Sequence, residues 1–154
     1  MKSKPEPDVG ELRSRALALL ARREHTRAEL ARKLQAAGYD AADVAPLLDE
    51  FESRNWLSDR RFAESWVADH RAKSGSVKLA YELRQRGVPD TVIDEVLRGE
   101  EDSELDRARA VWRKKFGTPP ADAAEKARQM RFLLGRGFST TLANKVIDAP
   151  RKTR

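Results

Sequence analysis

The stretch LQAAGY at residues 34–39 decides how this chain is organised, because it recurs as LRQRGV at 83–88 and as LLGRGF at 133–138. In each copy, a leucine is followed four residues later by a glycine and then by an apolar residue. The glycines lie 49 residues (38 to 87) and 50 residues (87 to 137) apart. A glycine in the left-handed conformation ends many helices, and the apolar residue after it folds back on the last turn. The pattern therefore predicts three helix ends at one period, and so a repeated unit.

Apolar residues on both sides of this motif extend the repeat. Ahead of the first copy, Leu12, Ala16 and Leu19 have the spacing of one helix face. After each copy, a short polar step leads to a pair of adjacent apolar residues: Leu47 and Leu48, Val96 and Leu97, Val146 and Ile147. No segment alternates apolar and polar residues for long enough to form a strand. We predict an all-α fold of three tandem three-helix repeats in an elongated, curved array whose handedness stays open.

Composition shifts set the expected boundaries. The units are predicted at 10–57, 58–99 and 100–149, with a disordered N-terminal tail at 1–9 and a basic C-terminal tail at 150–154. Within the first unit, Thr26 and Glu29 form a capping box pattern. Pro46 would break a helix that starts at Asp40 but fits the first turn of one capped at Asp43, so we favour the later start. Further helix caps are expected at Ser76, Asp90, Ser103 and Ser139.

The third unit departs from the other two in its middle helix, which the apolar spacing predicts to be longer. Its buried stripe is expected to contain Ala123, Ala127, Met130 and Leu134. Two tryptophans, Trp66 and Trp112, lie on apolar stripes and are expected in the core. Trp56 stands at a junction and is open to either a core role or base stacking.

Composition also narrows the class of protein. The 154 residues include no cysteine, which excludes disulfides and thiolate metal ligands and favours a reducing cytoplasm. The longest apolar runs are too short to cross a bilayer, and residues 1–7 lack the apolar segment of a signal peptide. We expect a cytoplasmic protein.

Catalytic chemistry is poorly supported. His25 and His70 are the only histidines; neither has a partner at metal-ligand spacing, and surface or capping roles are expected for both. Phosphate-loop and dinucleotide motifs are absent from the sequence. The acidic run at 100–102 is expected in a solvated linker. We predict a protein that is not an enzyme, with no cofactor and no metal site.

Positive charge is the feature that predicts a partner. The formal net charge is +6, and basic residues gather on helices of the second and third units. Such clusters neutralise phosphates, or they are ordinary solvated helix faces. The candidates are Arg71, Lys73, Lys78, Arg84, Arg86, Arg107, Arg109, Arg113, Lys114, Lys115, Arg128, Arg131 and Arg136.

Three segments of the chain carry a family resemblance: ALALLARREHTRAELARKL at 16–34, NWLSDRRFAESWV at 55–67 and ELRQRGV at 82–88. Together they closely resemble the RecX family. The resemblance covers Leu12 to Leu97 well, and the third unit fits in pattern with weaker motifs. It implies a regulator that lodges in the groove of the RecA–DNA filament, depresses its ATP hydrolysis and strand exchange, and so modulates recombination and DNA repair. The partners implied are the RecA filament and single-stranded or double-stranded DNA, bound by a monomer.

The resemblance also assigns individual residues. It adds Arg22, Arg23, Arg60 and Arg61 to the filament-binding candidates. It further implies that Asp59 and Phe62 set a helix start and its core contact, and that Gly75 precedes the fifth helix. Two departures are Asn55, where a glycine is common, and a 75–79 stretch that is less basic than in many members, which weakens the case for DNA contact there.

Two other functions stay open on the sequence alone. One three-helix unit could act as a helix-turn-helix in a general DNA-binding protein. The repeat equally allows a helical scaffold for an unrelated protein.

Overall fold

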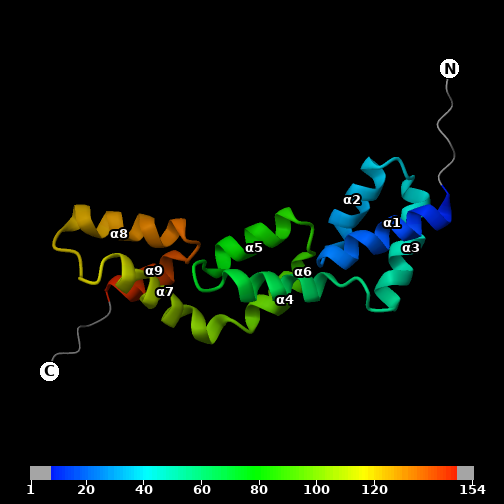
Figure 1. The fold of residues 1–154 in the computed structure, drawn as a ribbon. Coiled ribbons are helices and arrows are strands. Elements are labelled where there is room, and N and C mark those ends of the chain that lie inside the picture. Colours follow the sequence, from blue (N-terminus) through cyan, green and yellow to red (C-terminus); the bar gives the residue numbers. More distant parts are fainter. Residues whose placement is uncertain (1–7, 149–154) are drawn as a thin grey trace, which may run out of the picture.

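The structure is a computed structural model that describes residues 8–148, and this range is all helix and connecting turns (Figure 1). Nine helices in this range follow one another as three units of three. Their bounds are α1 Val9–Arg22, α2 Arg27–Ala36, α3 Ala41–Ser53, α4 Asp59–His70, α5 Ser76–Gln85, α6 Asp90–Arg98, α7 Glu101–Lys115, α8 Ala123–Gly135 and α9 Thr140–Ile147.

The three predicted helix ends are confirmed at the middle helix of each unit. Gly38, Gly87 and Gly137 have φ angles of 105°, 86° and 91°. The residue after each glycine is buried, and its N–H donates to the carbonyl of the leucine five residues earlier at 3.1–3.2 Å. This is the hydrogen bond of a Schellman motif. The motif therefore turns the chain at the same point of every unit.

Each unit encloses its own apolar core. The cores form around Leu30 and Phe51 in the first unit, Leu79 and Ile93 in the second, and Leu133 in the third. One fully buried alanine on the first helix of each unit marks equivalent positions: Ala16, Ala63 and Ala108. Trp66 and Trp112 are partly buried against the second and third cores, as predicted.

Polar and backbone contacts join the units, rather than one shared apolar core. The Thr26 hydroxyl donates to the carbonyl of Arg86 at 2.6 Å, which links the first unit to the second. The Gly75 N–H donates to the carbonyl of Arg136 at 2.8 Å, which links the second unit to the third. The units consequently lie end to end in an elongated array (Figure 1).

Several predicted helix starts were wrong. α3 begins at Ala41 after Asp40, so Pro46 lies in its second turn; burial of the helix face around Leu48 and Phe51 outweighs the one hydrogen bond that proline removes. α5 and α6 each start one residue earlier than expected, at Ser76 after Gly75 and at Asp90 after Pro89. The capping box of Thr26 and the cap of Ser139 are confirmed.

The acidic run at 100–102 is not a linker. Glu100 is the residue before α7, and Glu101 and Asp102 lie in its first turn, so the predicted cap Ser103 is inside the helix. Acidic side chains stabilise the first turn because they face the positive end of the helix dipole. At the other end of the chain, α1 begins at Val9, within the predicted 1–9 tail, because the Asp8 side chain caps it.

The buried stripe of α8 also differs from the prediction. α8 has 13 residues against 10 in both α2 and α5, so the expected extra length is confirmed. Ala123, Ala127 and Leu134 are exposed, however, and Gln129 and Leu133 are buried instead. Gln129 occupies the position of Leu30 and Leu79. Its amide is satisfied by the Trp112 indole N–H at 2.8 Å and the Thr118 carbonyl at 3.1 Å.

Candidate nucleic-acid interface

About half of the predicted binding residues are engaged in ion pairs. The residues paired with a carboxylate are Arg23, Arg60, Arg61, Arg71, Arg84, Arg107, Arg109 and Arg128. Exposed pairs of this kind contribute little to stability, yet they reduce the charge that a partner meets.

The other predicted residues have no carboxylate within 4.0 Å among residues 8–148. They are Arg22, Lys73, Lys78, Arg86, Arg113, Lys114, Lys115, Arg131 and Arg136. Most of them lie on the second and third units, which is where the sequence predicted the partner.

Arg107 is largely buried and hydrogen-bonded within the protein. Its side chain is 11% exposed and donates to the carbonyl of Arg71, to Glu100 and to Ser103. Burial lowers the pKa of Arg107 from its usual value, although Glu100 opposes the shift. This arginine therefore ties α7 to the end of α4 and offers little surface to a partner.

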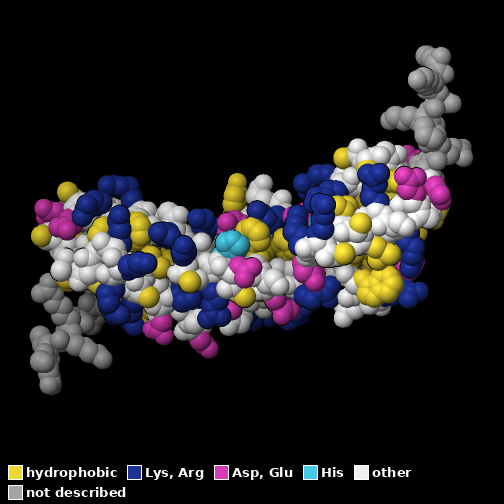
Figure 2. Space-filling model, in the orientation of Figure 1, with side chains coloured by type: hydrophobic (Ala, Val, Ile, Leu, Met, Phe, Trp, Pro, Cys, Tyr) yellow, Lys and Arg dark blue, Asp and Glu magenta, His cyan; other side chains and the backbone are white. Residues whose placement is uncertain are grey.

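Four of these nine cations line a groove between the second and third units, which we call the basic groove. It has a volume of about 550 Å³ and is lined by Ala72, Lys73, Ala110, Val111, Lys114, Lys115, Phe132 and Arg136. None of these described lining residues is acidic. Figure 2 shows lysine and arginine side chains around apolar surface over α7 and α8.

Three segments bring these side chains together. Lys73 lies in the turn after α4, Lys114 and Lys115 in the last turn of α7, and Arg136 at the end of α8. Basic residues suit the last turn of α7 because they face the negative end of its dipole.

An aromatic ring forms part of the floor. The Lys115 Nζ lies 5.6 Å and the Arg136 Cζ 5.3 Å from the centroid of the Phe132 ring. Phe116 packs against the same ring in a T-shaped arrangement, with centroids 5.4 Å apart. Phe132 is thus held in place between cations, within reach of a bound molecule.

A matching groove lies between the first and second units. It has a volume of about 440 Å³ and is lined by Arg23, Glu24, Glu29, Phe62, Ser65, Trp66, Asp69 and Arg86. Its arginines are engaged: Arg23 pairs with Glu29 at 3.2 Å, and Arg86 stacks 3.8 Å above the Trp66 ring. We call it the mixed groove, because three carboxylates face its two arginines.

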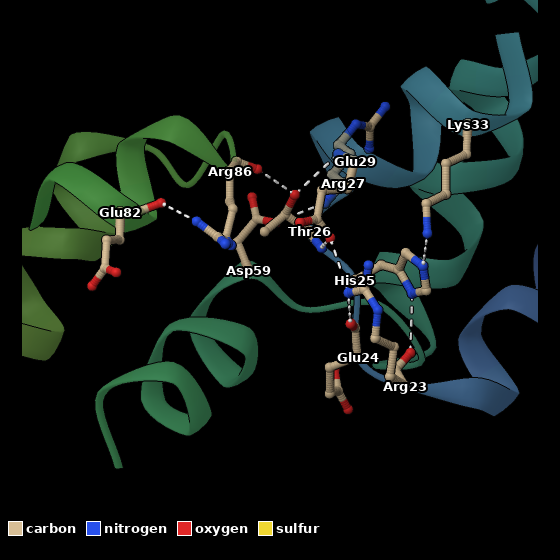
Figure 3. A network of polar contacts seen from close by, with 10 residues as sticks. All are labelled: Arg23, Glu24, His25, Thr26, Arg27, Glu29, Lys33, Asp59, Glu82 and Arg86. Atoms are coloured by element: carbon tan, nitrogen blue, oxygen red, sulfur yellow. Dashed lines mark hydrogen bonds and ion pairs between the residues drawn. The ribbon is translucent and has the colours of Figure 1, made fainter. Parts of the chain in front are cut away.

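Each of the two junctions contains a carboxylate that caps a helix of the neighbouring unit, a role that the sequence did not predict. Asp59 accepts from the Arg27 N–H at 2.8 Å, and Glu104 accepts from the Ser76 N–H at 2.7 Å. Each carboxylate comes from the first helix of one unit and caps the middle helix of the unit before it. Asp59 therefore does not cap its own helix, which Ser58 does. Figure 3 shows this network at the first junction.

The sequence contained a signal for these capping residues. Asp59 and Glu104 each stand four residues before the buried alanine of their unit, and Leu12 stands at the equivalent position of the first unit. Leu12 is buried in the core of the first unit, where it contacts apolar residues and caps no other helix. Burial raises the pKa of Asp59, and the hydrogen bond from Arg27 opposes this shift.

His25 is buried beside the same junction, so the surface alternative of the prediction is wrong, and its contact with Arg23, the residue that ends α1, fits the capping alternative. Its Nδ1 lies 3.0 Å from the Arg23 carbonyl and its Nε2 lies 3.0 Å from the Lys33 Nζ. A carbonyl only accepts and an ammonium only donates, so the proton of the neutral ring sits on Nδ1. Burial lowers the pKa of His25, as do the charges of Arg23 and Lys33.

Residues 8–148 hold no cluster of three or more histidine or acidic side chains arranged to bind a metal ion. Over the same residues, no helix combines the length and the apolar character needed to span a bilayer.

Comparison with known proteins gives one consistent result. The three-helix units match the RecX first, second and third three-helix domains over residues 13–51, 58–97 and 101–147. A "Regulatory protein RecX" from Ralstonia nicotianae is 46% identical over 89% of this chain and 86% of its own length. One from Chromobacterium violaceum is 48% identical over 88% of both chains.

Solved structures agree in fold. The crystal structure of RecX from Lactobacillus salivarius has a TM-score of 0.82 and 16% sequence identity, and the match covers 91% of this chain and 94% of that one. The domain order, the identity to relatives along most of their length and the shared fold together show that this chain belongs to the RecX family.

Proposed function

We propose that this protein regulates the RecA recombinase by binding the RecA–DNA filament and lowering its ATP hydrolysis and strand exchange. The observation that carries the proposal is the order of three RecX three-helix domains along one chain. Its relatives are named as regulatory proteins, and the family resemblance implies RecA as the target.

The shape and charge of the molecule support this mode of action. An elongated array reaches several protomers of a filament and gains affinity from several weak contacts. The unpaired cations of the second and third units supply attraction to DNA or to acidic protein surface. Regulation then acts by occupancy: ATP chemistry stays on RecA, and this chain needs neither a catalytic residue nor a cofactor.

The protein is further proposed to act as a monomer in the cytoplasm. Each unit completes its core within one chain, so a monomer suffices. The cytoplasm is the compartment in which the proposed partner, a filament on DNA, is found.

The direct test is RecA-dependent ATP hydrolysis on single-stranded DNA at rising concentrations of this protein. We expect the rate to fall at substoichiometric amounts, because one bound chain affects several protomers. An unchanged rate at saturating protein would remove RecA as the target. Co-sedimentation with RecA filaments at several salt concentrations separates binding from inhibition.

A general DNA-binding function is the second candidate, and the basic groove is the observation that favours it. Its signature is tight, sequence-dependent binding to duplex DNA without RecA, measured by gel shift. A scaffold for an unrelated protein is distinguished by affinity capture from cell extract, where RecA would be missing from the eluate.

A further inference from the structure

We infer that an acidic, partly apolar groove of the second unit docks a basic amphipathic helix of a partner protein. The groove lies where α5, α6 and the start of α7 meet, and we call it the acidic groove. It has a volume of about 510 Å³ and is lined by Ser76, Val77, Ala80, Asp94, Leu97, Arg98, Glu101 and Glu104. The inference goes beyond the proposed function, because it assigns a separate site for a protein segment, and it is tested without DNA or RecA.

Exposed apolar side chains are the first argument. Val77 is 58% exposed and Tyr81 is 59% exposed, and they lie four residues apart on α5, so they share one face of that helix. Ala80 and Leu97 continue the apolar surface into the groove, where both are partly buried. Contiguous apolar surface that remains in water marks a site of interaction.

The other units show that the fold does not require apolar residues at these positions of α5. The middle helices of the three units can be aligned on the buried position of Leu79. The matching residues of α2 and α8 are then alanine for Val77 and arginine for Tyr81: Ala28, Ala127, Arg32 and Arg131. Larger apolar side chains are therefore a property of the second unit alone, and the repeated architecture does not explain them.

The third helix of the second unit shows the same difference. Leu97 is partly buried, whereas its counterparts Leu48 and Ile147 are only 1% and 6% exposed. The equivalent leucine and isoleucine are thus covered within their own units. Leu97 keeps part of its apolar surface open to the groove, where a side chain of a partner can cover it.

Charge defines the chemistry of the partner. Asp94 and Glu101 are exposed, and neither has a basic nitrogen within 4.0 Å among residues 8–148. Glu104 is buried and accepts from the Ser76 N–H. Arg98 is the one cation among the lining residues. Three carboxylates therefore outnumber one arginine, in a chain whose formal net charge is +6. This local negative charge attracts lysine and arginine and repels phosphate.

The surroundings of the groove favour a helix as the occupant. A peptide that extends a sheet needs an exposed strand edge, and residues 8–148 contain no strand. A groove between helices instead takes an amphipathic helix, whose apolar side chains recur every three or four residues and anchor in it. Lysines or arginines beside that apolar face would lie next to Asp94 and Glu101.

The test measures fluorescence anisotropy of a labelled synthetic peptide with the full chain. The peptide has two heptads with leucine on one helix face and lysine elsewhere. One control peptide replaces each lysine by glutamate, and a second has the leucines and lysines in scrambled order, without an apolar face. We expect the first peptide to bind at least about tenfold more tightly than either control, because only it matches both the charge and the apolar surface. Equal binding of the ordered and scrambled basic peptides would overturn the inference.

Charge variants locate the site. Asp94→Asn/Glu101→Gln should weaken binding of the basic peptide about fivefold, because two exposed ion pairs are lost, and its affinity should depend less on salt. The matched control is Glu11→Gln/Asp43→Asn, which removes two exposed carboxylates of the first unit. The control should bind as the wild type does. Equal losses in the two variants would mean diffuse attraction without a site.

Arg98 gives a test of opposite sign. Arg98→Gln removes the one cation that faces the proposed lysines, so it should strengthen binding of the basic peptide severalfold. A loss of affinity in this variant would place the peptide elsewhere on the molecule and overturn the inference.

Apolar variants test the second feature of the groove. Val77→Ala/Tyr81→Gln should weaken binding about tenfold, because exposed tyrosines are common anchors of interfaces. The matched control is Val9→Ala/Leu17→Gln, which changes two exposed apolar residues of α1. Circular dichroism melting shows whether each variant is folded. Binding by Val77→Ala/Tyr81→Gln that equals the wild type would remove the apolar contact and overturn the inference.

Two other occupants would also overturn it. Sedimentation velocity should show no self-association that depends on Asp94 and Glu101; if it does, the groove is a contact between copies of this chain. The basic residues near the C-terminus are tested by Arg151→Gln/Lys152→Gln/Arg154→Gln. Tighter peptide binding by that variant would mean that this chain's own tail occupies the groove.

These outcomes are separate from the proposed function. A wild type that binds the basic peptide in the acidic groove but leaves RecA hydrolysis unchanged supports the groove and removes the RecA role. A wild type that inhibits RecA but binds the ordered and scrambled peptides equally removes the groove alone.

Discussion

The missing Cβ of a glycine allows the second and third units to pack closely. A Cβ at Gly137 would overlap the backbone and Cβ of Lys78, whereas a Cβ at Gly38 would meet nothing within 4 Å. Both glycines have positive φ angles, so they share the same backbone constraint. They differ only in whether another unit packs against them.

This pair predicts two different stabilities. Gly38→Ala should lower the free energy of unfolding by about 1 kcal/mol, the cost of a left-handed alanine. Gly137→Ala should cost about 1–3 kcal/mol more, because it adds steric overlap in a packed contact. Urea unfolding followed by circular dichroism measures both. Equal losses of unfolding free energy in the two variants would show that the junction accommodates the added methyl group without loss of stability.

His25 predicts a dependence of stability on pH. Its pKa is lowered in the folded protein, so below its usual value of about 6.5 the unfolded chain binds more protons than the folded chain. The contribution of His25 to stability is therefore present above pH 6.5 and is lost as the pH falls through the lowered value.

The check is urea unfolding between pH 5 and pH 8 for wild type and His25→Gln. The variant should show a smaller loss of stability below about pH 6.5. His70→Gln is the control, since the His70 ring is only partly buried and stacks on Trp66. If His25→Gln and wild type lose stability in parallel, His25 is not the group responsible.

Helix starts in this molecule depend on partners outside the helix. α2 has its own cap in Thr26 and a second acceptor in Asp59. α5 starts at Ser76, has no side-chain cap from the preceding Gly75 and relies on Glu104. α8 is capped by Asp122 of its own unit. The caps from Asp59 and Glu104 thus link the first unit to the second and the second unit to the third.

Asp59 tests this arrangement. Asp59→Ala should lower the free energy of unfolding by about 1 kcal/mol, because the Arg27 N–H loses its acceptor. Asp59→Asn keeps an acceptor and removes a charge that burial disfavours, so it should stay within about 0.5 kcal/mol of wild type at neutral pH.

The matched control is Asp40→Ala, since Asp40 precedes α3 without a side-chain cap hydrogen bond. Chemical denaturation should show a smaller loss there than for Asp59→Ala. A loss as large at Asp40 would mean that the measurement reports general helix electrostatics.

Residues 8–148 form three small apolar cores, and hydrogen bonds join each unit to the next. We call these contacts between units the joints. Since each core is closed within its unit, damage to a joint should change the shape of the array more than its helical content. A regulator that bridges several protomers depends on that shape.

Gly75→Ala tests the joint between the second and third units. The added Cβ would overlap the carbonyl of Gly137, so we expect an altered radius of gyration in small-angle scattering with little change in circular dichroism. Gly99→Ala is the control, because its Cβ would meet the Val96 carbonyl at an ordinary 3.6 Å. Unchanged scattering for Gly75→Ala would show a joint that absorbs the methyl group without moving.

The candidate site was predictable in part. Local composition placed Lys114, Lys115 and Arg136 among the binding residues, because clusters of like charge are visible in sequence. The same reasoning included Arg107, whose burial depends on Glu100 and on the end of α4. The role of Phe132 and the difference between the basic and mixed grooves depend on residues that are far apart in the chain.

Local physics alone determined the helical fold and its threefold repetition. Helix periodicity, glycine ends and short-range caps are interactions among residues a few positions apart, and they are legible without coordinates. Tertiary structure decided the rest: which face of α8 is buried, that Asp59 and Glu104 cap the preceding unit, and that His25 loses contact with water. These depend on which segments meet across a junction, and desolvation and charge pairing act only once they have met.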